Sequence, residues 1–452
     1  MMDDPRPVAS TIKTSWGIAL IAFLARLTSF AISQIANNSA ADYDTSAGLQ
    51  RLDCCSADTV SVPLADSWSQ SKAVWDSVFF TRIALCGYEY EQFYAFFPLL
   101  PGLMNVGMKS VQGIKQGLLP DAALASAATC LSLAAFVTSA VYLHKLSISI
   151  LKDARLADLA ALLYIWNPAS VFYSVAYTEG LFACTAFVGL FHLNQRPWLA
   201  TAFFCAASAA RSNGILHCWF ILHRLANMLY HQHDGQPLQG ADCAMLLSQA
   251  ALQCMLICLP AFAFQYAGWR SFCVGGITKR PWCSTKPPSI YSFVQSHYWG
   301  VGLFRYFHLQ QLPNFLLALP VLCLSFAGCW TYFSQDWKRA LLLGIHRAAP
   351  RQVQTAVQRW PAKPTANKQH GFARAENGFG NDRVAPYVYQ WALMTACTCF
   401  VMHVQVATRF LSACPPLYWY IASLHNRKWI WAYFLLYFCL GSILFPNFYP
   451  WT

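Results

Sequence analysis

Apolar stretches separated by short polar turns run along most of the chain. Several of them reach or approach the roughly 20 residues that a helix needs to cross the core of a bilayer. The first stretch is too long for the core of a signal peptide and lacks a small-residue cleavage site behind it, so we expect it to be retained as a membrane helix. We predict helices at residues 12–33, 121–145, 157–173, 178–194, 198–210, 214–229, 246–268, 314–334, 389–408, 411–424 and 429–446.

The composition supports a membrane protein. The 452 residues are 56% hydrophobic and only 11% charged, whereas soluble domains carry about 25% charged residues. We therefore predict an all-α polytopic membrane protein with about 11 transmembrane helices and two large loops on one side of the membrane. The expected segments are 1–33 (N-terminus and first helix), 34–120 (first large loop), 121–268 (membrane helices), 269–313 (second large loop), 314–334 (membrane helix), 335–388 (basic loop) and 389–452 (C-terminal membrane helices).

The basic residues set the expected orientation. Outside the large loops, most Lys and Arg fall in the turns at 145–155, 195–197, 230–243, 336–383 and 425–428. The positive-inside rule places these turns in the cytoplasm and the large loops on the lumenal side. Topology thus accounts for the net charge of +12, and we expect no nucleic-acid partner. The basic 335–388 segment, rich in Gln, Ala, Asn and Pro, is predicted to be disordered.

The first large loop is acidic relative to the others and contains a weak glycosylation sequon, Asn37-Asn38-Ser39, which agrees with a lumenal location. The apolar stretch 93–108 is short and interrupted by prolines, so we expect it to lie at the membrane interface. The 18 cysteines show no CxxC pair and no metal-ligand spacing, and the sequence predicts neither a metal site nor a cofactor. Five cysteines in the large loops are available for disulfides whose pairing the sequence leaves open, namely Cys54, Cys55, Cys86, Cys273 and Cys283.

The first large loop also holds the main candidates for chemistry. Carboxylates suited to accept a proton stand beside aromatic rings suited to hold a sugar. The candidate catalytic acids are Asp76, Glu89 and Glu91, and the candidate binding residues around them are Trp75, Arg82, Tyr88 and Gln92. The competing interpretation is an interfacial aromatic belt with solvated loop charges.

Further candidates interrupt the apolar helices near their predicted lumenal ends. They are Tyr177, Glu179, Arg211, Asn213, His403, Gln405 and Arg409. Ionisable residues within a membrane are costly and tend to mark function, although Glu179, Arg211 and Arg409 are equally suited to pair with one another and stabilise the bundle. The second large loop adds Trp282, Trp299 and Arg305, either as an acceptor or lipid-headgroup surface or as a packed loop that caps the first.

These residues lie in short motifs that follow one another across nearly the whole chain. The motifs are Trp75-Asp76, Gly87-Tyr88-Glu89-Tyr90-Glu91-Gln92, Ala95-Phe96-Phe97-Pro98, Asn167-Pro168-Ala169, Tyr177-Thr178-Glu179, Arg211-Ser212-Asn213-Gly214, Pro281-Trp282-Cys283, Tyr298-Trp299-Gly300-Val301-Gly302, Pro313-Asn314-Phe315 and His403-Val404-Gln405-Val406. In content and order they resemble the PIG-V type of GPI mannosyltransferase. The resemblance implies a GT-C glycosyltransferase of the endoplasmic reticulum membrane with a lumenal active site. It further implies dolichyl phosphate mannose as donor and a mannosyl-glucosaminyl-phosphatidylinositol as acceptor, joined by an inverting transfer that forms an α-1,6 bond to the second mannose.

By this resemblance Asp76 is the expected general base, and Arg211 or Arg409 is expected to offset charge on the leaving phosphate. One position departs from the pattern, because Phe79 stands where many relatives of this type carry a His after the Trp-Asp motif. Another dolichyl-phosphate-sugar-dependent GT-C transferase, a multi-pass transporter and a non-catalytic scaffold are the alternatives. The sequence leaves open whether a small membrane partner subunit is required.

Overall fold

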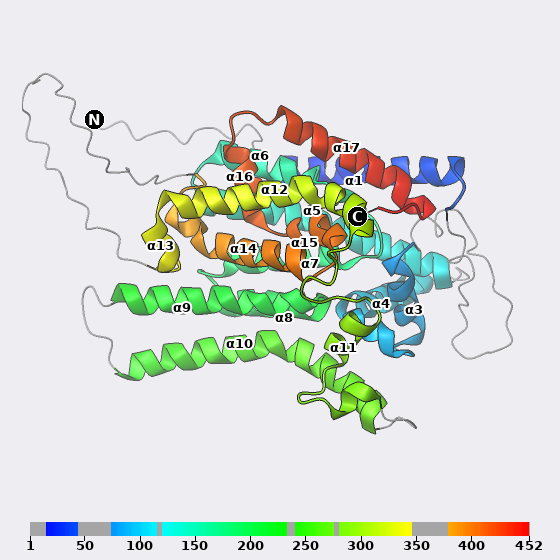
Figure 1. Ribbon diagram of the computed structural model, residues 1–452, viewed down its shortest axis with the longest axis horizontal. Helices are drawn as coiled ribbons and strands as arrows, with labels where there is room; N and C mark the ends of the chain where they lie inside the picture. The colour runs from blue at the N-terminus through cyan, green and yellow to red at the C-terminus, as the bar shows by residue number, and fades with distance from the viewer. Residues whose placement is uncertain are drawn as a thin grey trace, which may run out of the picture.

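A computed structural model describes residues 15–43, 74–114, 120–232, 240–274, 280–345 and 378–451. Within these ranges the chain forms helices and no strand, which confirms the predicted all-α class. The longer helices lie side by side in an elongated bundle (Figure 1). Its α-helices are α1 Ser15–Ser39, α3 Asp76–Cys86, α4 Leu99–Ile114, α5 Pro120–Leu151, α6 Ala154–Ile165, α7 Thr178–His192, α8 Pro197–Ala210, α9 Cys218–Gln232, α10 Gly240–Trp269, α11 Ile290–His297, α12 Leu312–Gln335, α13 Trp337–Leu341, α14 Ala385–Phe400, α15 Ala407–Leu411, α16 Pro415–Ser423 and α17 Lys428–Leu444.

Five helical stretches are long and apolar enough to cross a membrane. They are Ser15–Ser39, Ala122–Leu151, Gly240–Val274, Leu309–Gln335 and Lys428–Asn447. A chain with this many such helices is a polytopic membrane protein, as the sequence predicts. The remaining predicted spans correspond to shorter helices, so the total of eleven crossings stays a prediction.

Two predicted helices end earlier than expected. The helix expected over 157–173 is α6, which ends at Ile165, because Pro168 lacks an N–H and disfavours the helical conformation before it. Asn167 closes the turn that follows, donating from Nδ2 to the Tyr164 carbonyl and accepting from the Ala169 N–H. The helix expected over 389–408 likewise ends at Phe400, and a short helix, α15, follows it.

α1 is joined to the turn after α6 by a buried arginine that the sequence analysis did not single out. Arg26 is fully buried and donates hydrogen bonds to Ser170 and to Ser174 Oγ (3.1 Å). Its guanidinium also lies 4.2 Å from the centre of the Phe136 ring on α5. Because burying a guanidinium is costly unless it is hydrogen-bonded, the hydrogen bonds of the two Arg26 Nη groups favour one way of docking α1 on the bundle.

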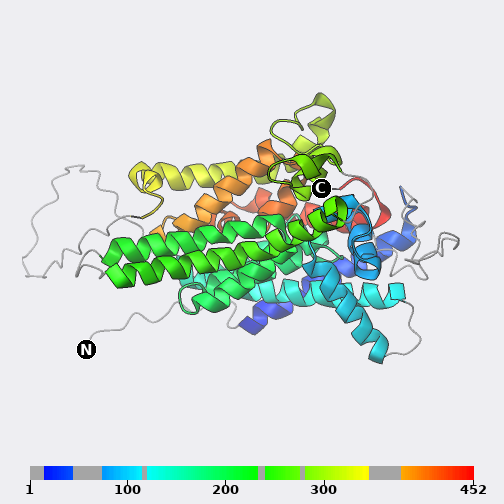
Figure 2. The same ribbon diagram turned by 90° about the horizontal axis from the view of Figure 1, so that it is seen from below.

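The bundle has two chemically different ends. α3, α4 and α11 gather at one end, and α13 lies at the other (Figures 1 and 2). Residues from three of the turns predicted to face the cytoplasm, including Lys152, Gln195 and Arg383, come together around one cavity at the α13 end. Of the basic segment 335–388, residues 346–377 lie outside the described residues, and the flanking parts form α13, the short turn Asp382–Val384 and the start of α14.

Candidate active site

A cavity of about 300 Å³ opens at the end of the bundle formed by α3, α4 and α11. Residues far apart in the sequence meet there, from α3, the ends of α7 and α8, the second large loop and the turn before α15. Among the predicted site residues, its lining includes Asp76, Arg211, Trp299, His403, Gln405 and Arg409. The structure thus brings six of the predicted residues to one hollow.

A network of two arginines and two carboxylates borders the cavity. Glu179, in the first turn of α7, accepts from Arg409 Nε at 2.7 Å and from Arg211 Nη1 at 2.9 Å through the same oxygen, Oε1. Arg409 Nη1 also lies 3.1 Å from Asp76 Oδ2. The Glu179 side chain is almost fully buried, whereas 36% of the Asp76 side chain is exposed. Glu179 therefore organises the two guanidiniums, and Asp76 is the carboxylate that reaches the cavity.

Aromatic rings fix the two arginines in place. The Arg409 guanidinium lies 4.7 Å and 4.8 Å from the ring centres of Phe172 and Tyr177. Arg211 lies 4.3 Å from the centre of the Phe410 ring. Such cation–π contacts hold a guanidinium in one orientation without occupying its hydrogen-bond donors. The arginines are positioned to present donors to an anion in the cavity.

Asp76 begins α3, where the helix N-terminus favours a negative charge. Its backbone N–H donates to the Tyr177 hydroxyl at 2.9 Å, so Tyr177 positions the start of this helix. The residue before it, Trp75, has a positive φ of 52° and packs its ring 6.0 Å from that of Phe448. A strained backbone held in place by tertiary contacts is a frequent feature of functional sites.

The other two candidate acids occupy different surroundings. Glu89 forms two hydrogen bonds with Arg82, at 2.7 and 3.0 Å, and this pairing raises the pKa of the Arg82 guanidinium above its usual value. Glu91 is buried and accepts from Trp282 Nε1 and from the Tyr298 hydroxyl at 3.1 Å. Neither carboxylate lines the cavity. Glu89 thus stabilises the first large loop through Arg82, and Glu91 joins the first large loop to the second through Trp282 and Tyr298.

The second large loop packs against the first. The Cys273–Cys283 disulfide lies next to Trp282, whose indole reaches Glu91. Burial and the hydrogen bond to Glu91 raise the pKa of Tyr298 above its usual value, so this hydroxyl stays protonated and donates. Of the loop residues predicted to bind substrate, Trp299 lines the cavity, whereas Trp282 is buried outside it and Arg305 is exposed outside it.

The remaining predicted residues lie outside the cavity lining. Tyr88 donates to the Phe96 carbonyl at 2.7 Å, and Phe96 is a cavity residue. Gln92 is part of a short 3₁₀ turn in the first loop. Asn213 borders a separate, much smaller pocket beside Phe410.

In and beside the cavity the structure adds residues that were not among the predicted site residues. Tyr291 and Ser212 share a hydrogen bond of 2.8 Å between their hydroxyls, and both line the cavity. Tyr306 stacks on His403, with ring centres 4.5 Å apart, and donates to Gln405 at 2.9 Å. The described residues contain no group of three or more His, Cys, Asp or Glu placed to hold a metal ion.

Comparisons with known proteins agree with this arrangement. Residues 16–452 match the family model described as mannosyltransferase (PIG-V). The GPI α-1,6-mannosyltransferase 2 of Rattus norvegicus is 32% identical over 84% of this chain and 87% of its own length, and that of Homo sapiens is 29% identical over the same shares. The GPI mannosyltransferase 2 of Drosophila pseudoobscura pseudoobscura is 32% identical over 84% of this chain and 86% of its own length. No solved structure matches the chain significantly. The chain therefore belongs to the PIG-V family of mannosyltransferases.

Proposed function

We propose that this protein transfers the second mannose of the GPI anchor, in α-1,6 linkage, from dolichyl phosphate mannose to the mannosyl-glucosaminyl-phosphatidylinositol intermediate. Relatives that carry the name GPI α-1,6-mannosyltransferase 2 support the acceptor and the linkage. The observation that carries the chemistry is the exposed Asp76 carboxylate on a cavity shared with Arg211 and Arg409.

In the proposed reaction Asp76 acts as the general base. The acceptor hydroxyl attacks C1 of the donor mannose while its proton passes to the Asp76 carboxylate, and the bond from C1 to the phosphate oxygen breaks with its electron pair on the phosphate. One displacement converts the β-linked donor into an α-linked product. General base catalysis of this kind contributes about 10²- to 10⁴-fold to a rate.

In the same reaction the two arginines, Arg211 and Arg409, stabilise the negative charge on the leaving phosphate. As the bond to the leaving group breaks, negative charge grows on the dolichyl phosphate, and planar guanidinium donors match phosphate oxygens. Because Glu179 and the aromatic rings already hold Arg211 and Arg409, little reorganisation is needed when the charge develops. The phosphate then leaves without a metal ion being chemically required.

The same proposal sets the orientation in the membrane. Donor and acceptor are lipids whose headgroups meet the enzyme at a membrane surface, and the cavity lies at one end of helices such as α7 and α14. The opposite end carries the basic turns that favour the cytoplasm. We propose that the cavity faces the lumen of the endoplasmic reticulum.

Asp76→Asn, expressed in cells that lack the second GPI mannosyltransferase, tests the proposal. We expect the one-mannose glycolipid to accumulate although the variant inserts normally into the membrane. Glu89→Gln is the matched control, because it neutralises a loop carboxylate that does not line the cavity, and it should restore the two-mannose product. Full rescue by Asp76→Asn would remove Asp76 from the mechanism, and failure of the wild-type chain to rescue would remove the assigned reaction.

A further inference from the structure

A second and larger cavity, of about 850 Å³, opens at the end of the bundle opposite the candidate active site. α7 runs between the two, because Thr178 lines the active-site cavity and Phe191 lines the second one. At 1.5 Å per residue, the two ends of this helix are about 20 Å apart. The second cavity therefore cannot be part of the same site.

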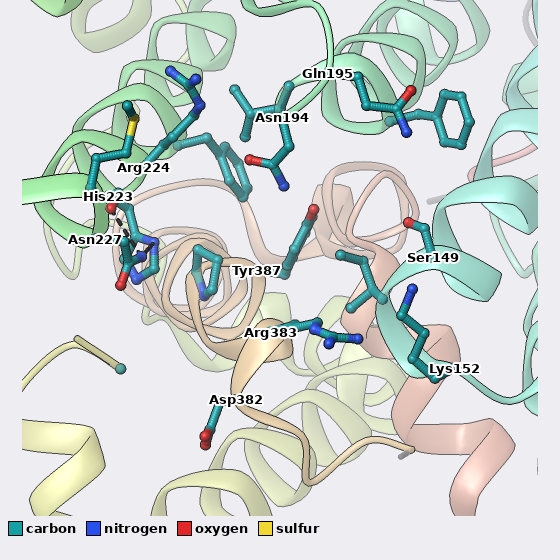
Figure 3. Close-up of a pocket in the computed structure, with 17 residues that line it drawn as sticks. Ser149, Lys152, Asn194, Gln195, His223, Arg224, Asn227, Asp382, Arg383 and Tyr387 are labelled. Atoms are coloured by element: carbon teal, nitrogen blue, oxygen red, sulfur yellow. Dashed lines mark hydrogen bonds between the residues drawn. The ribbon is translucent and has the colours of Figure 1, made fainter. Parts of the chain in front are cut away.

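Three cations line this second cavity, and they come from three different elements (Figure 3). Lys152 follows α5, Arg224 lies on α9 and Arg383 lies in the turn Asp382–Val384 before α14. None of the three forms an ion pair with any residue that the structure describes. The single acid in the lining, Asp382, is held by Arg339 at 3.1 Å. The cavity thus carries an excess of positive charge.

Neutral hydrogen-bonding groups stand among these cations. The side chains of Asn194 and Tyr387 lie between Arg224 and the pair formed by Lys152 and Arg383 (Figure 3). His223 and Asn227, by contrast, already bond to each other, and His223 also reaches the Leu343 carbonyl at 3.0 Å. Guanidinium, ammonium, amide and hydroxyl groups therefore line one cavity, and all four are donors suited to phosphate oxygens.

Apolar side chains also form part of the wall. Phe191, Leu193, Phe220 and Met228 line the same cavity as the cations. A free phosphate ion has no apolar atoms to bury against this surface, whereas a phospholipid would bury its glycerol and first acyl carbons there. The volume also falls in the range of about 300–1,000 Å³ that is typical of ligand pockets.

The surroundings favour a lipid source as well. The segment between α13 and α14 carries six Lys or Arg residues and one Glu over residues 346–377. Such a segment strengthens the attraction of this end of the protein to an anionic membrane surface, and basic pockets between membrane helices are typical sites for anionic headgroups.

We propose that this cavity binds the phosphate of an anionic phospholipid, with Lys152, Arg224 and Arg383 as its ligands and the apolar wall against its glycerol backbone. The site is separate from the sugar-transfer cavity and holds its lipid from the opposite membrane surface. It would make the stability of the bundle depend on the anionic lipid content of that leaflet, because a ligand that binds only the folded state stabilises it.

The test uses the purified full-length protein in neutral detergent, titrated with phosphatidylinositol, phosphatidylcholine or inorganic phosphate while its thermal midpoint is followed. Phosphatidylinositol should raise the midpoint and phosphatidylcholine should not. In the double variant Lys152→Gln/Arg383→Gln, the concentration of phosphatidylinositol needed for the same rise in midpoint should increase roughly 25-fold. Each basic residue at a lipid surface contributes about a fivefold change in affinity. Arg155→Gln with Lys428→Gln is the matched control, because both residues are exposed and outside the cavity lining, and it should leave the effect unchanged.

Other outcomes overturn the proposal. Equal responses to phosphatidylinositol and phosphatidylcholine would show that the cavity does not select a negative headgroup. If the cavity double variant and the control lost the response to phosphatidylinositol equally, the response would depend on surface charge and not on the cavity. Stabilisation by inorganic phosphate without any effect of phosphatidylinositol would replace the lipid with a soluble phosphate ligand. Since the readout is binding, it does not depend on the sugar-transfer reaction.

Discussion

Arg409 Nη1 lies 3.1 Å from Asp76 Oδ2, and this contact joins residues 333 positions apart in the chain. The same guanidinium donates from Nε to Glu179 at 2.7 Å. One planar side chain therefore holds the proposed base and the buried carboxylate of α7 together, which explains why an arginine, and not a lysine, suits this position.

Replacing Arg409 with lysine should abolish this double contact. A lysine ammonium is a single point charge and cannot reproduce the Nε and Nη1 geometry. We expect the transfer rate to fall by about 10²-fold or more, as when a preorganised donor is removed from an active site. Product formation in microsomes with a defined acceptor measures this, and Arg155→Lys, at an exposed position away from the cavity, is the control. A fully active Arg409→Lys variant would show that the bridge is dispensable.

Substitution of Glu91 should destabilise the protein more than substitution of Glu89, and neither residue should take part in the transfer chemistry. Glu91→Ala leaves the buried Trp282 N–H without its acceptor and also removes the acceptor of Tyr298, so we expect a loss of about 3 kcal/mol in unfolding free energy. Glu89→Ala breaks a partly exposed pair with Arg82, and its cost should be at most about 1 kcal/mol.

Thermal unfolding in detergent, followed for both variants side by side, measures this difference. If Glu91→Ala kept the wild-type unfolding midpoint but lost transfer activity, Glu91 would have a catalytic role and not a structural one.

Position 79 carries Phe where a His was expected, and we predict that this difference does not remove a catalytic group from the enzyme. Its ring stacks on Phe96, with centres 4.6 Å apart, and meets Phe93 edge-on at 5.9 Å. Phe79 does not line the cavity, although Phe96 does. Phe79→His should therefore give no gain in transfer rate and a loss of about 1 kcal/mol of stability, the scale of one aromatic pair. Phe79→Leu is the control, and a faster Phe79→His enzyme would contradict this account.

Much of the fold follows from the apolar pattern, because membrane helices are specified by local composition. The predicted spans at 246–268, 314–334 and 429–446 correspond to α10, α12 and α17, with bounds shifted by a few residues. The end of the helix at Ile165 was not predicted. The residues on both sides of Pro168 are apolar, so the hydrophobic pattern alone predicts one continuous helix there.

The candidate site was only partly accessible from the sequence. Polar residues that interrupt apolar helices, such as Glu179, Arg211 and Arg409, stand out because their burial is costly, and the structure brings all three together. Tyr291 also lines the cavity, but it lies on the short helix α11, in an aromatic-rich part of the sequence where many residues look alike. Its place in the cavity depends on tertiary packing that no short motif encodes.

Gly214 should be irreplaceable at the hairpin that carries Arg211. A Cβ at this position would lie 2.4 Å from the Cα and backbone N of Ser208, and backbone atoms of α8 cannot rotate away as a flexible side chain would. Gly214→Ala must therefore separate the turn from α8, at a cost of about 2 kcal/mol, and displace the Arg211 guanidinium from Glu179. Gly102→Ala, in α4 with no atom within 4 Å of the added Cβ, is the matched control. We expect the Gly214 variant to lose both thermal stability and mannose transfer while the control keeps both; wild-type transfer by Gly214→Ala would show that the position of Arg211 does not depend on this close approach.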